Sequence, residues 1–206
     1  GMTEMSPLGS YNRPMEWMST GTQAEQDAHI VRAGRIVFGV EMKIVDTDHH
    51  ELPWDGVASG LLLVKGPWVI SSYYRAEESS TLDADGWFDT GDMAAIDEYG
   101  YVSITDRVKD VIKSGGEWIS SIDVENAAMG HPDVQEAAVI GVADPKWTER
   151  PLLIVIPVEG IIPDKDAILA FLEGKIAKWW IPGDCLFVSE IPHTATGKIS
   201  KKDLRD

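Results

Sequence analysis

Residues 101–119, YVSITDRVKDVIKSGGEWI, decide how the rest of this 206-residue sequence is interpreted. Residues 101–105 and 93–96 flank a polar turn and predict a β-hairpin. The charged run at residues 106–110 then interrupts the pattern. Beyond it, a short strand turns at Ser114-Gly115-Gly116 and begins to return at Trp118. This change of pattern predicts a boundary between two units near residues 106–109.

The sequence before this stretch predicts mostly turns and strands. Residues 1–22 are turn-rich, and residues 23–33 have the spacing of a helix that Gly34 ends. Residues 40–45 alternate as a half-buried strand, and residues 60–65 are typical of a short buried strand.

The sequence after this stretch predicts a second, smaller unit. Residues 120–123 have the form of a capping box that opens a helix ending at Gly130. The longest helix is expected at residues 164–178, with an apolar face and lysines near its C-terminal end. The remaining expected elements are strands at 137–142, 152–158 and 185–188 and a helical turn at 200–205. The fold class is therefore α+β or mixed α/β.

Composition and charge exclude several classes of protein. With 44% hydrophobic and 25% charged residues, the chain is globular, and its length suits one or two domains. The net charge of −16 argues against a nucleic-acid partner. No apolar run approaches the roughly 20 residues of a membrane span, and no signal peptide is apparent. The single cysteine, Cys185, excludes a disulfide framework and fits a reducing, cytoplasmic compartment.

Four short motifs carry side chains that could handle a nucleotide. Asp92 follows a glycine turn and could accept hydrogen bonds from two ribose hydroxyls, and Arg107 offers a planar fork for ribose or phosphate oxygens. Gly115 and Gly116 let the backbone approach a ligand closely. Lys198 could stabilise charge on a phosphoryl group. Taken alone, each feature is explained at least as well by a surface turn, an exposed ion pair or a solvated lysine.

Taken together, the order and spacing of these motifs resemble the adenylate-forming superfamily of acyl-CoA synthetases, peptide-synthetase adenylation domains and luciferases. Residues 86–92, GWFDTGD, are similar to its Trp/Tyr-x-Thr-Gly-Asp motif, and residues 101–119 to its hinge motif. Residues 194–199, TATGKI, resemble its Gly-Lys motif, and residues 1–7 its Gly-x-Thr-Glu motif. The form that the hinge motif takes in this sequence, together with residues 146–151, is most similar to the form in the medium- and long-chain fatty-acid branch of the family.

The resemblance implies a role for individual residues. The family makes an acyl-adenylate from a carboxylic acid and ATP and then passes the acyl group to coenzyme A. Asp92 and Arg107 match the residues that bind the ribose of AMP, and Lys198 matches the lysine that bridges the carboxylate and the α-phosphate. Glu4 matches a ligand of Mg²⁺, and Thr3 matches a threonine beside the phosphate.

The resemblance also implies a domain layout. Residues 1–106 would be the β-rich end of a large AMP-binding domain, residues 107–109 a hinge centred on Lys109, and residues 110–206 a small mobile domain. The implied ligands are ATP or AMP, Mg²⁺, coenzyme A and a fatty acid. Lys146 and Arg150 could meet the phosphates of coenzyme A. The hairpin at residues 113–118 would bind the cofactor with Lys113 and Trp118, and its glycines, Gly115 and Gly116, would line the pantetheine tunnel.

Two parts of the family pattern are not found in this sequence: the Ser/Thr/Gly-rich phosphate loop and the acyl pocket. We therefore expect a fragment of a fatty-acid–CoA ligase that is inactive alone, completed by an N-terminal half or associating as a homo-oligomer. The alternative is a non-catalytic homologue that binds AMP, coenzyme A or a partner ligase. A fragment with no function is a third possibility.

Overall fold

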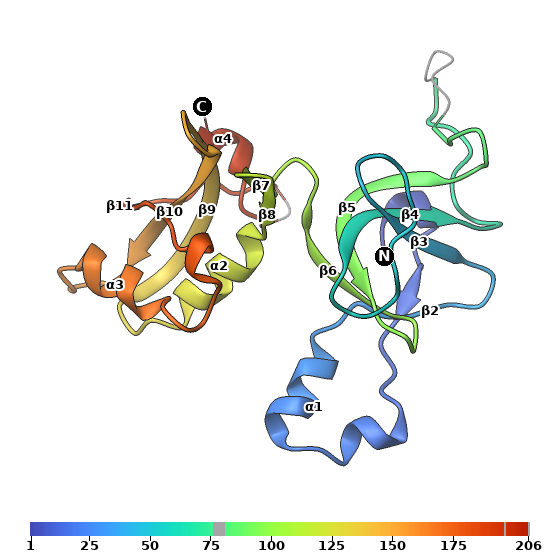
Figure 1. Cartoon of the computed structure of the whole chain (residues 1–206), viewed down its shortest axis with the longest axis horizontal. Coiled ribbons are helices and arrows are strands. Elements are labelled where there is room, and N and C mark those ends of the chain that lie inside the picture. Colours follow the sequence, from blue (N-terminus) through green and yellow to red (C-terminus); the bar gives the residue numbers. More distant parts are fainter. Residues whose placement is uncertain (76–80, 196, 206) are drawn as a thin grey trace. The chain divides into compact units, whose positions relative to one another are not determined.

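The computed structural model describes residues 1–75, 81–195 and 197–205, which form two compact units (Figure 1). The first unit is Gly1–Val108 and the second is Lys109–Asp206, so the division falls within the segment expected as a hinge. Thr196 of the Gly-Lys motif lies outside the described residues. Each unit has its own apolar core.

The first unit is built on a six-stranded antiparallel sheet with the order β1-β2-β6-β5-β4-β3. Its core forms because alternate residues of β3, β4 and β5 point to one face, where Ile44, Val64 and Ile96 are fully buried. The strands are β1 (Ser10–Tyr11), β2 (Gly34–Ile36), β3 (Glu41–Val45), β4 (Ser59–Lys65), β5 (Phe88–Ile96) and β6 (Tyr101–Arg107). Three short helices accompany them: η1 (Thr3–Met5), η2 (Glu16–Ser19) and α1 (Gln23–Ile30).

Helix α1 projects away from the sheet and is held at both ends by side chains (Figure 1). Thr22 and Glu25 form a capping box at its start. At its end, the amide of Asn12 donates to three backbone carbonyls, those of residues 29, 30 and 32. The helix is therefore shorter than the predicted 23–33, and Gly34 opens β2, a strand that the sequence analysis did not predict.

The second unit combines a mixed five-stranded sheet with helices. Strands β11, β10, β7 and β8 are neighbours in that order, and β9 pairs with β10. Among the strands of the described residues in this unit, β10 and β11 pair in parallel, whereas the other pairings are antiparallel. The strands are β7 (Ile112–Ser114), β8 (Glu117–Ile119), β9 (Val134–Asp144), β10 (Thr148–Pro157) and β11 (Asp184–Phe187). The helices are α2 (Ser121–Met129), α3 (Lys165–Phe171), η3 (Lys178–Trp180) and α4 (Lys201–Arg205). The predicted α+β class is confirmed, and no helix in the described residues is long and apolar enough to cross a membrane.

The prediction of a long helix over residues 164–178 is wrong. Helix α3 ends at Phe171, and Gly174 has a φ of 75°, which is incompatible with a continuing right-handed helix. Lys175 closes the end, since its Nζ donates to the carbonyl of Phe171 at 3.0 Å. Leu172 and Ile176 still pack on the core, so their spacing indicated burial rather than helix length. Among the described helices, α2 with nine residues is the longest.

Candidate functional site

The β5–β6 hairpin of the first unit brings two predicted site residues together. Asp92 and Arg107 are direct partners in the antiparallel register. Nε of Arg107 lies 3.8 Å from Oδ1 of Asp92, and the two side chains are 49% and 29% exposed. An ion pair with this separation and exposure contributes little to stability. Its polar atoms remain accessible to a ligand from solvent.

Backbone geometry fixes the position of Asp92. Gly91, with a φ of 71°, makes the turn that precedes it. The hydroxyl of Thr90 donates to the carbonyl of Leu62 at 2.8 Å and accepts the N–H of Asp92 at 3.2 Å. The N–H of Val108 donates to the carbonyl of Gly91 at 3.0 Å. The Thr-Gly-Asp motif is therefore tied to β4 on one side and to the end of β6 on the other.

A cavity of about 130 Å³ lies beside Asp92. Both residues 1–7 and the Thr-Gly-Asp motif contribute to its wall, so the segments of the Gly-x-Thr-Glu motif and of the Thr-Gly-Asp motif meet in the fold. The residues that line it include Gly1, Met2, Met5, Leu62, Thr90, Asp92 and Ile104.

Glu4 is held in η1 next to this cavity wall. Its Oε1 accepts a hydrogen bond from the hydroxyl of Tyr73 at 3.1 Å, and its carbonyl accepts the N–H of Ile70 at 2.9 Å. The pKa of the Tyr73 hydroxyl is raised: the larger effect is its partial removal from water, and a smaller one is its hydrogen bond to Glu4. Thr3 is exposed on the same turn. A single partly exposed carboxylate fits Mg²⁺, which usually takes one or two carboxylates and completes its shell with phosphate and water.

The described residues contain a cluster of three potential metal ligands elsewhere in the first unit. Asp46, Asp48 and His50 follow β3, and their ligand atoms lie within 4.8 Å of one another. Oδ1 of Asp46 already accepts the N–H groups of both other residues, and all three side chains lie on a surface turn. The cluster does not include Glu4.

In the second unit, the β7–β8 hairpin presents the residues expected to meet coenzyme A. Gly115 has a φ of 59° and its N–H donates to the carbonyl of Trp147 at 2.8 Å. A Cβ at Gly115 would lie 2.6 Å from the indole of Trp147, so the ring would have to shift to admit any other residue there. Gly116 has a φ of 88° with open space around it, Lys113 is exposed and Trp118 is half-buried.

A cavity of about 280 Å³ lies against this hairpin. The guanidinium of Arg150 donates to the carbonyls of Trp179 and Ile181, at 2.7 and 2.8 Å, and so fixes the η3 segment beside the hairpin. Nζ of Lys146 lies 4.6 Å from the ring centroid of Trp147. Trp147 and Trp179 were not predicted as site residues, although tryptophans near basic residues are typical of binding surfaces. The cavity is lined by Ser114, Gly115, Glu117, Trp147, Arg150 and Trp179.

Lys198 is exposed in a tight loop of the second unit. Its carbonyl accepts the N–H of Thr194 at 2.7 Å, and its N–H donates to the hydroxyl of Thr194 at 3.2 Å. Gly197 has a φ of 79° and donates its N–H to the carbonyl of Thr194 at 2.9 Å. Lys109 is exposed at the first position of this unit.

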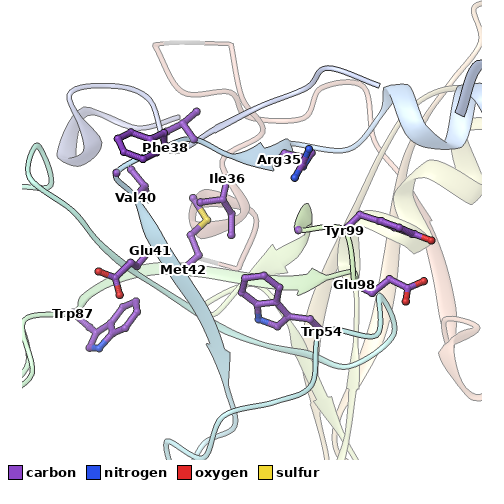
Figure 2. Close-up of a pocket in the computed structure, with 13 residues that line it drawn as sticks. Arg35, Ile36, Phe38, Val40, Glu41, Met42, Trp54, Trp87, Glu98 and Tyr99 are labelled. Atoms are coloured by element: carbon purple, nitrogen blue, oxygen red, sulfur yellow. The ribbon is translucent and has the colours of Figure 1, made fainter. Parts of the chain in front are cut away.

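A larger cavity of the first unit, about 580 Å³, contains none of the predicted site residues (Figure 2). Aromatic side chains from separate loops surround it, and Nζ of Lys43 lies 4.5 Å from the ring centroid of Trp87. The labelled lining residues include Phe38, Trp54, Trp87, Glu98 and Tyr99.

Comparison with known proteins connects these features to one family. Residues 1–74 match the model of the AMP-binding enzyme family, and residues 123–198 match that of the AMP-binding enzyme C-terminal domain. The chain is 51% identical to 3-methylmercaptopropionyl-CoA ligase of Ruegeria lacuscaerulensis and 43% identical to medium-chain-fatty-acid–CoA ligase of Ectopseudomonas oleovorans. In both cases the match covers all of this chain and 38% of the relative. ATP-bound MatB from Rhodopseudomonas palustris matches with a TM-score of 0.83 and 32% identity, over the whole chain and 39% of that structure.

The chain therefore belongs to the adenylate-forming AMP-binding enzymes, and the resemblance drawn from its motifs is confirmed. It spans about two-fifths of the length of these relatives, at 38%.

Proposed function

We propose that this chain is the part of an acyl-CoA ligase that binds the ribose of AMP, carries the adenylation lysine and receives coenzyme A. The observation that carries the proposal is the register pair of Asp92 and Arg107 at the end of the first unit. A carboxylate and a guanidinium side by side present acceptors and donors to vicinal hydroxyls. The match to AMP-binding enzymes over residues 1–74 supports a nucleotide ligand.

In the adenylation step, a carboxylate oxygen of the acid attacks the α-phosphorus of ATP and pyrophosphate leaves. Asp92 accepts hydrogen bonds from the ribose hydroxyls and Arg107 donates to ribose oxygens, which holds the nucleotide in place. The ammonium of Lys198 offsets the negative charge that develops between the carboxylate and the phosphate. Glu4 would hold Mg²⁺, which neutralises phosphate charge, and Thr3 would lie beside the phosphate.

In the thioester step, the thiol of coenzyme A attacks the carbonyl of the acyl-adenylate and AMP leaves. We propose that the second unit turns at residues 107–109 between the two steps. Gly115 and Gly116 then give the pantetheine arm a narrow passage beside Lys113 and Trp118. The exposed faces of Trp147 and Trp179 suit stacking of the adenine. Lys146 supplies positive charge for the phosphates.

The substrate that we propose is a short- to medium-chain carboxylic acid. The relatives named above act, by their names, on 3-methylmercaptopropionate and on medium-chain fatty acids. We place the activity in the cytoplasm, which the single buried Cys185 supports. We also propose that activity requires the complementary part of a ligase.

Calorimetry with AMP on the 206-residue chain tests the nucleotide site. We expect binding that is lost in Asp92→Ala and in Arg107→Ala, because each variant removes one half of the ribose site. Asp85→Ala is the matched control, since Asp85 is an exposed carboxylate on a neighbouring turn. Equal binding by Asp92→Ala and the unmodified chain would contradict the proposal.

A chimera tests the chemistry. The chain is joined to the remainder of the Ruegeria ligase, and pyrophosphate exchange and thioester formation are measured separately. We expect Lys198→Ala to slow adenylation far more than thioester formation from preformed acyl-adenylate, while Lys202→Ala changes neither. A chimera that binds AMP but catalyses neither step would favour the non-catalytic alternative. Equal losses in both steps would remove the role given to Lys198.

A further inference from the structure

A largely buried ion pair attaches helix α4 to the body of the second unit. Nζ of Lys201 lies 2.8 Å from Oε1 of Glu125, and the two side chains are only 10% and 13% exposed. The same ammonium donates to the hydroxyl of Ser121. Oε1 of Glu125 also accepts the N–H of Val139 at 2.7 Å. This one carboxylate oxygen therefore joins α2, β9 and α4.

A second ion pair attaches the last turn of α4 to the start of the unit. Nη2 of Arg205 lies 2.9 Å from Oδ1 of Asp110, with side chains 32% and 12% exposed. Asp110 directly follows Lys109, the first residue of the unit. The two pairs, Lys201–Glu125 and Arg205–Asp110, are called the C-terminal clasp below.

Helix α4 depends on the clasp because it is too short to be stable by itself. It spans five residues, and an isolated helix of that length is unstable in water. Ile199 and Leu204 pack against the outer face of the β9–β10 pair, but both are only partly buried. Lys198 comes three residues before Lys201, in a loop whose described hydrogen bonds are mostly internal. Among the described residues, the loop is also attached through His193, whose Nε2 lies 2.8 Å from Oε1 of Glu136 in β9, with side chains 37% and 28% exposed. The Lys201–Glu125 pair of the clasp is the less exposed of these two attachments.

We propose that Lys201 and Arg205 are positioning residues for Lys198. The clasp fixes the loop that carries Lys198 to the unit and couples it to Asp110, so that the lysine moves with the unit as one rigid part. This inference rests on the role proposed for Lys198. The clasp residues themselves touch no substrate.

Hydrogen exchange on the 206-residue chain tests the attachment without any activity. The reporters are the amides of Thr194, Gly197 and Ser200, whose acceptors lie at 2.7, 2.9 and 2.7 Å. We expect Lys201→Met to speed their exchange at least about 10-fold, because the Glu125 carboxylate, which is only 13% exposed, loses its ammonium partner. The β9–β10 amides should exchange as in the unmodified chain. Lys202→Met is the matched control, because Lys202 is adjacent and exposed.

Two further variants cover the case in which Lys201→Met unfolds the unit. Lys201→Arg keeps the charge and should restore slow exchange. Arg205→Gln breaks only the partly exposed pair and should speed exchange at Ser200 by a few-fold, on the order of 3-fold. Exchange at all reporters equal to the unmodified chain in both Lys201→Met and Arg205→Gln would overturn the proposal. So would a uniform rise over the whole unit in Arg205→Gln.

Half-reactions of the chimera then separate positioning from simple stability. We expect Lys201→Met to lower the rate of pyrophosphate exchange at least about 10-fold and thioester formation from preformed acyl-adenylate less than about 2-fold. Equal losses in both steps would contradict positioning. If Lys198→Ala leaves adenylation unchanged, the proposed function fails, whereas the hydrogen-exchange result still decides whether the clasp holds the loop.

Discussion

At the scale of single residues, the position of Arg107 opposite Asp92 follows from strand register rather than from attraction. The antiparallel pairing of β5 and β6 would place any two side chains at these positions near each other. The chemistry therefore depends on which side chains occupy them. A guanidinium presents several donors in one plane, whereas an ammonium is a point charge.

Arg107→Lys separates these two properties. The variant keeps the positive charge but loses the planar fork, so we expect AMP affinity to fall about 10-fold, equivalent to one lost hydrogen bond to a charged group. Calorimetry with AMP measures the change. Arg13→Lys is the control, because Arg13 is exposed on another segment of the same unit. Affinity equal to that of the unmodified chain would show that charge alone is used.

Cys185 gives a prediction about pH at the same scale. Burial raises the pKa of its thiol from 9.0 to about 11. The folded unit therefore holds this proton where the unfolded chain has lost it, and stability falls as pH rises from about 9 to about 11. At pH 8 we expect native Cys185 to react with a thiol reagent at least about 100-fold more slowly than in urea, because two pKa units separate the thiolate fractions. Equal labelling rates would refute this burial.

At the scale of elements, the β7–β8 hairpin depends on two glycines for different reasons. Both have positive φ, but only at Gly115 does a neighbouring side chain, the indole of Trp147, occupy the space of a Cβ. We expect Gly116→Ala to lower the free energy of unfolding of the second unit by about 1 kcal/mol, from φ alone. Gly115→Ala should cost about 1–3 kcal/mol more, because the ring must move. Urea denaturation measures the free energy of unfolding of both variants. An equal decrease in both would mean that the indole of Trp147 moves aside at no cost.

Most elements could be predicted from the sequence because their patterns are local. Alternating apolar residues give β3, and apolar runs give β4, β9 and β10. The predicted helix after Ser120 forms as α2, since the Ser120 hydroxyl accepts the N–H of Asp123. Strand β2 was missed because its three residues pair through contacts that are distant in sequence, with β1 on one side and β6 on the other. Helix α3 was predicted too long because the prediction followed the helical spacing of the apolar residues and did not treat Gly174 as the end of the helix.

The candidate site was predicted only as separate residues. The sequence indicates Asp92 and Arg107 but contains no signal for their 3.8 Å separation, which arises from pairing of β5 with β6. Trp147 and Trp179 are 32 positions apart and meet at one cavity only because Arg150 binds the η3 segment. Contacts of this kind depend on tertiary packing, and a motif in one segment does not encode them.

At the scale of the whole molecule, each unit has the core that independent folding requires. Among its described residues, the second unit buries twelve in its main cluster, from strands β7 to β11, from helices α2 and α3, and from Leu172 directly after α3. We expect residues 109–206 alone to fold and to unfold cooperatively in urea, followed by circular dichroism. In the 206-residue chain its transition midpoint should be unchanged. A midpoint that falls strongly on separation would show that the first unit is needed for its stability.

Lys109 is the point at which rotation of the second unit would be concentrated. On one side, the N–H of Val108 is bonded to Gly91, and on the other, Asp110 is held by Arg205. Lys109→Pro fixes φ at 109 and restricts the preceding residue, so the proposed hinge loses backbone freedom. In the chimera we expect thioester formation to fall at least about 10-fold while pyrophosphate exchange stays within about 2-fold, because only the second step needs the turn. Lys109→Ala removes the side chain without restricting φ and should behave like the unmodified chimera. If both variants slow both steps alike, the side chain rather than the rotation at 109 is what matters.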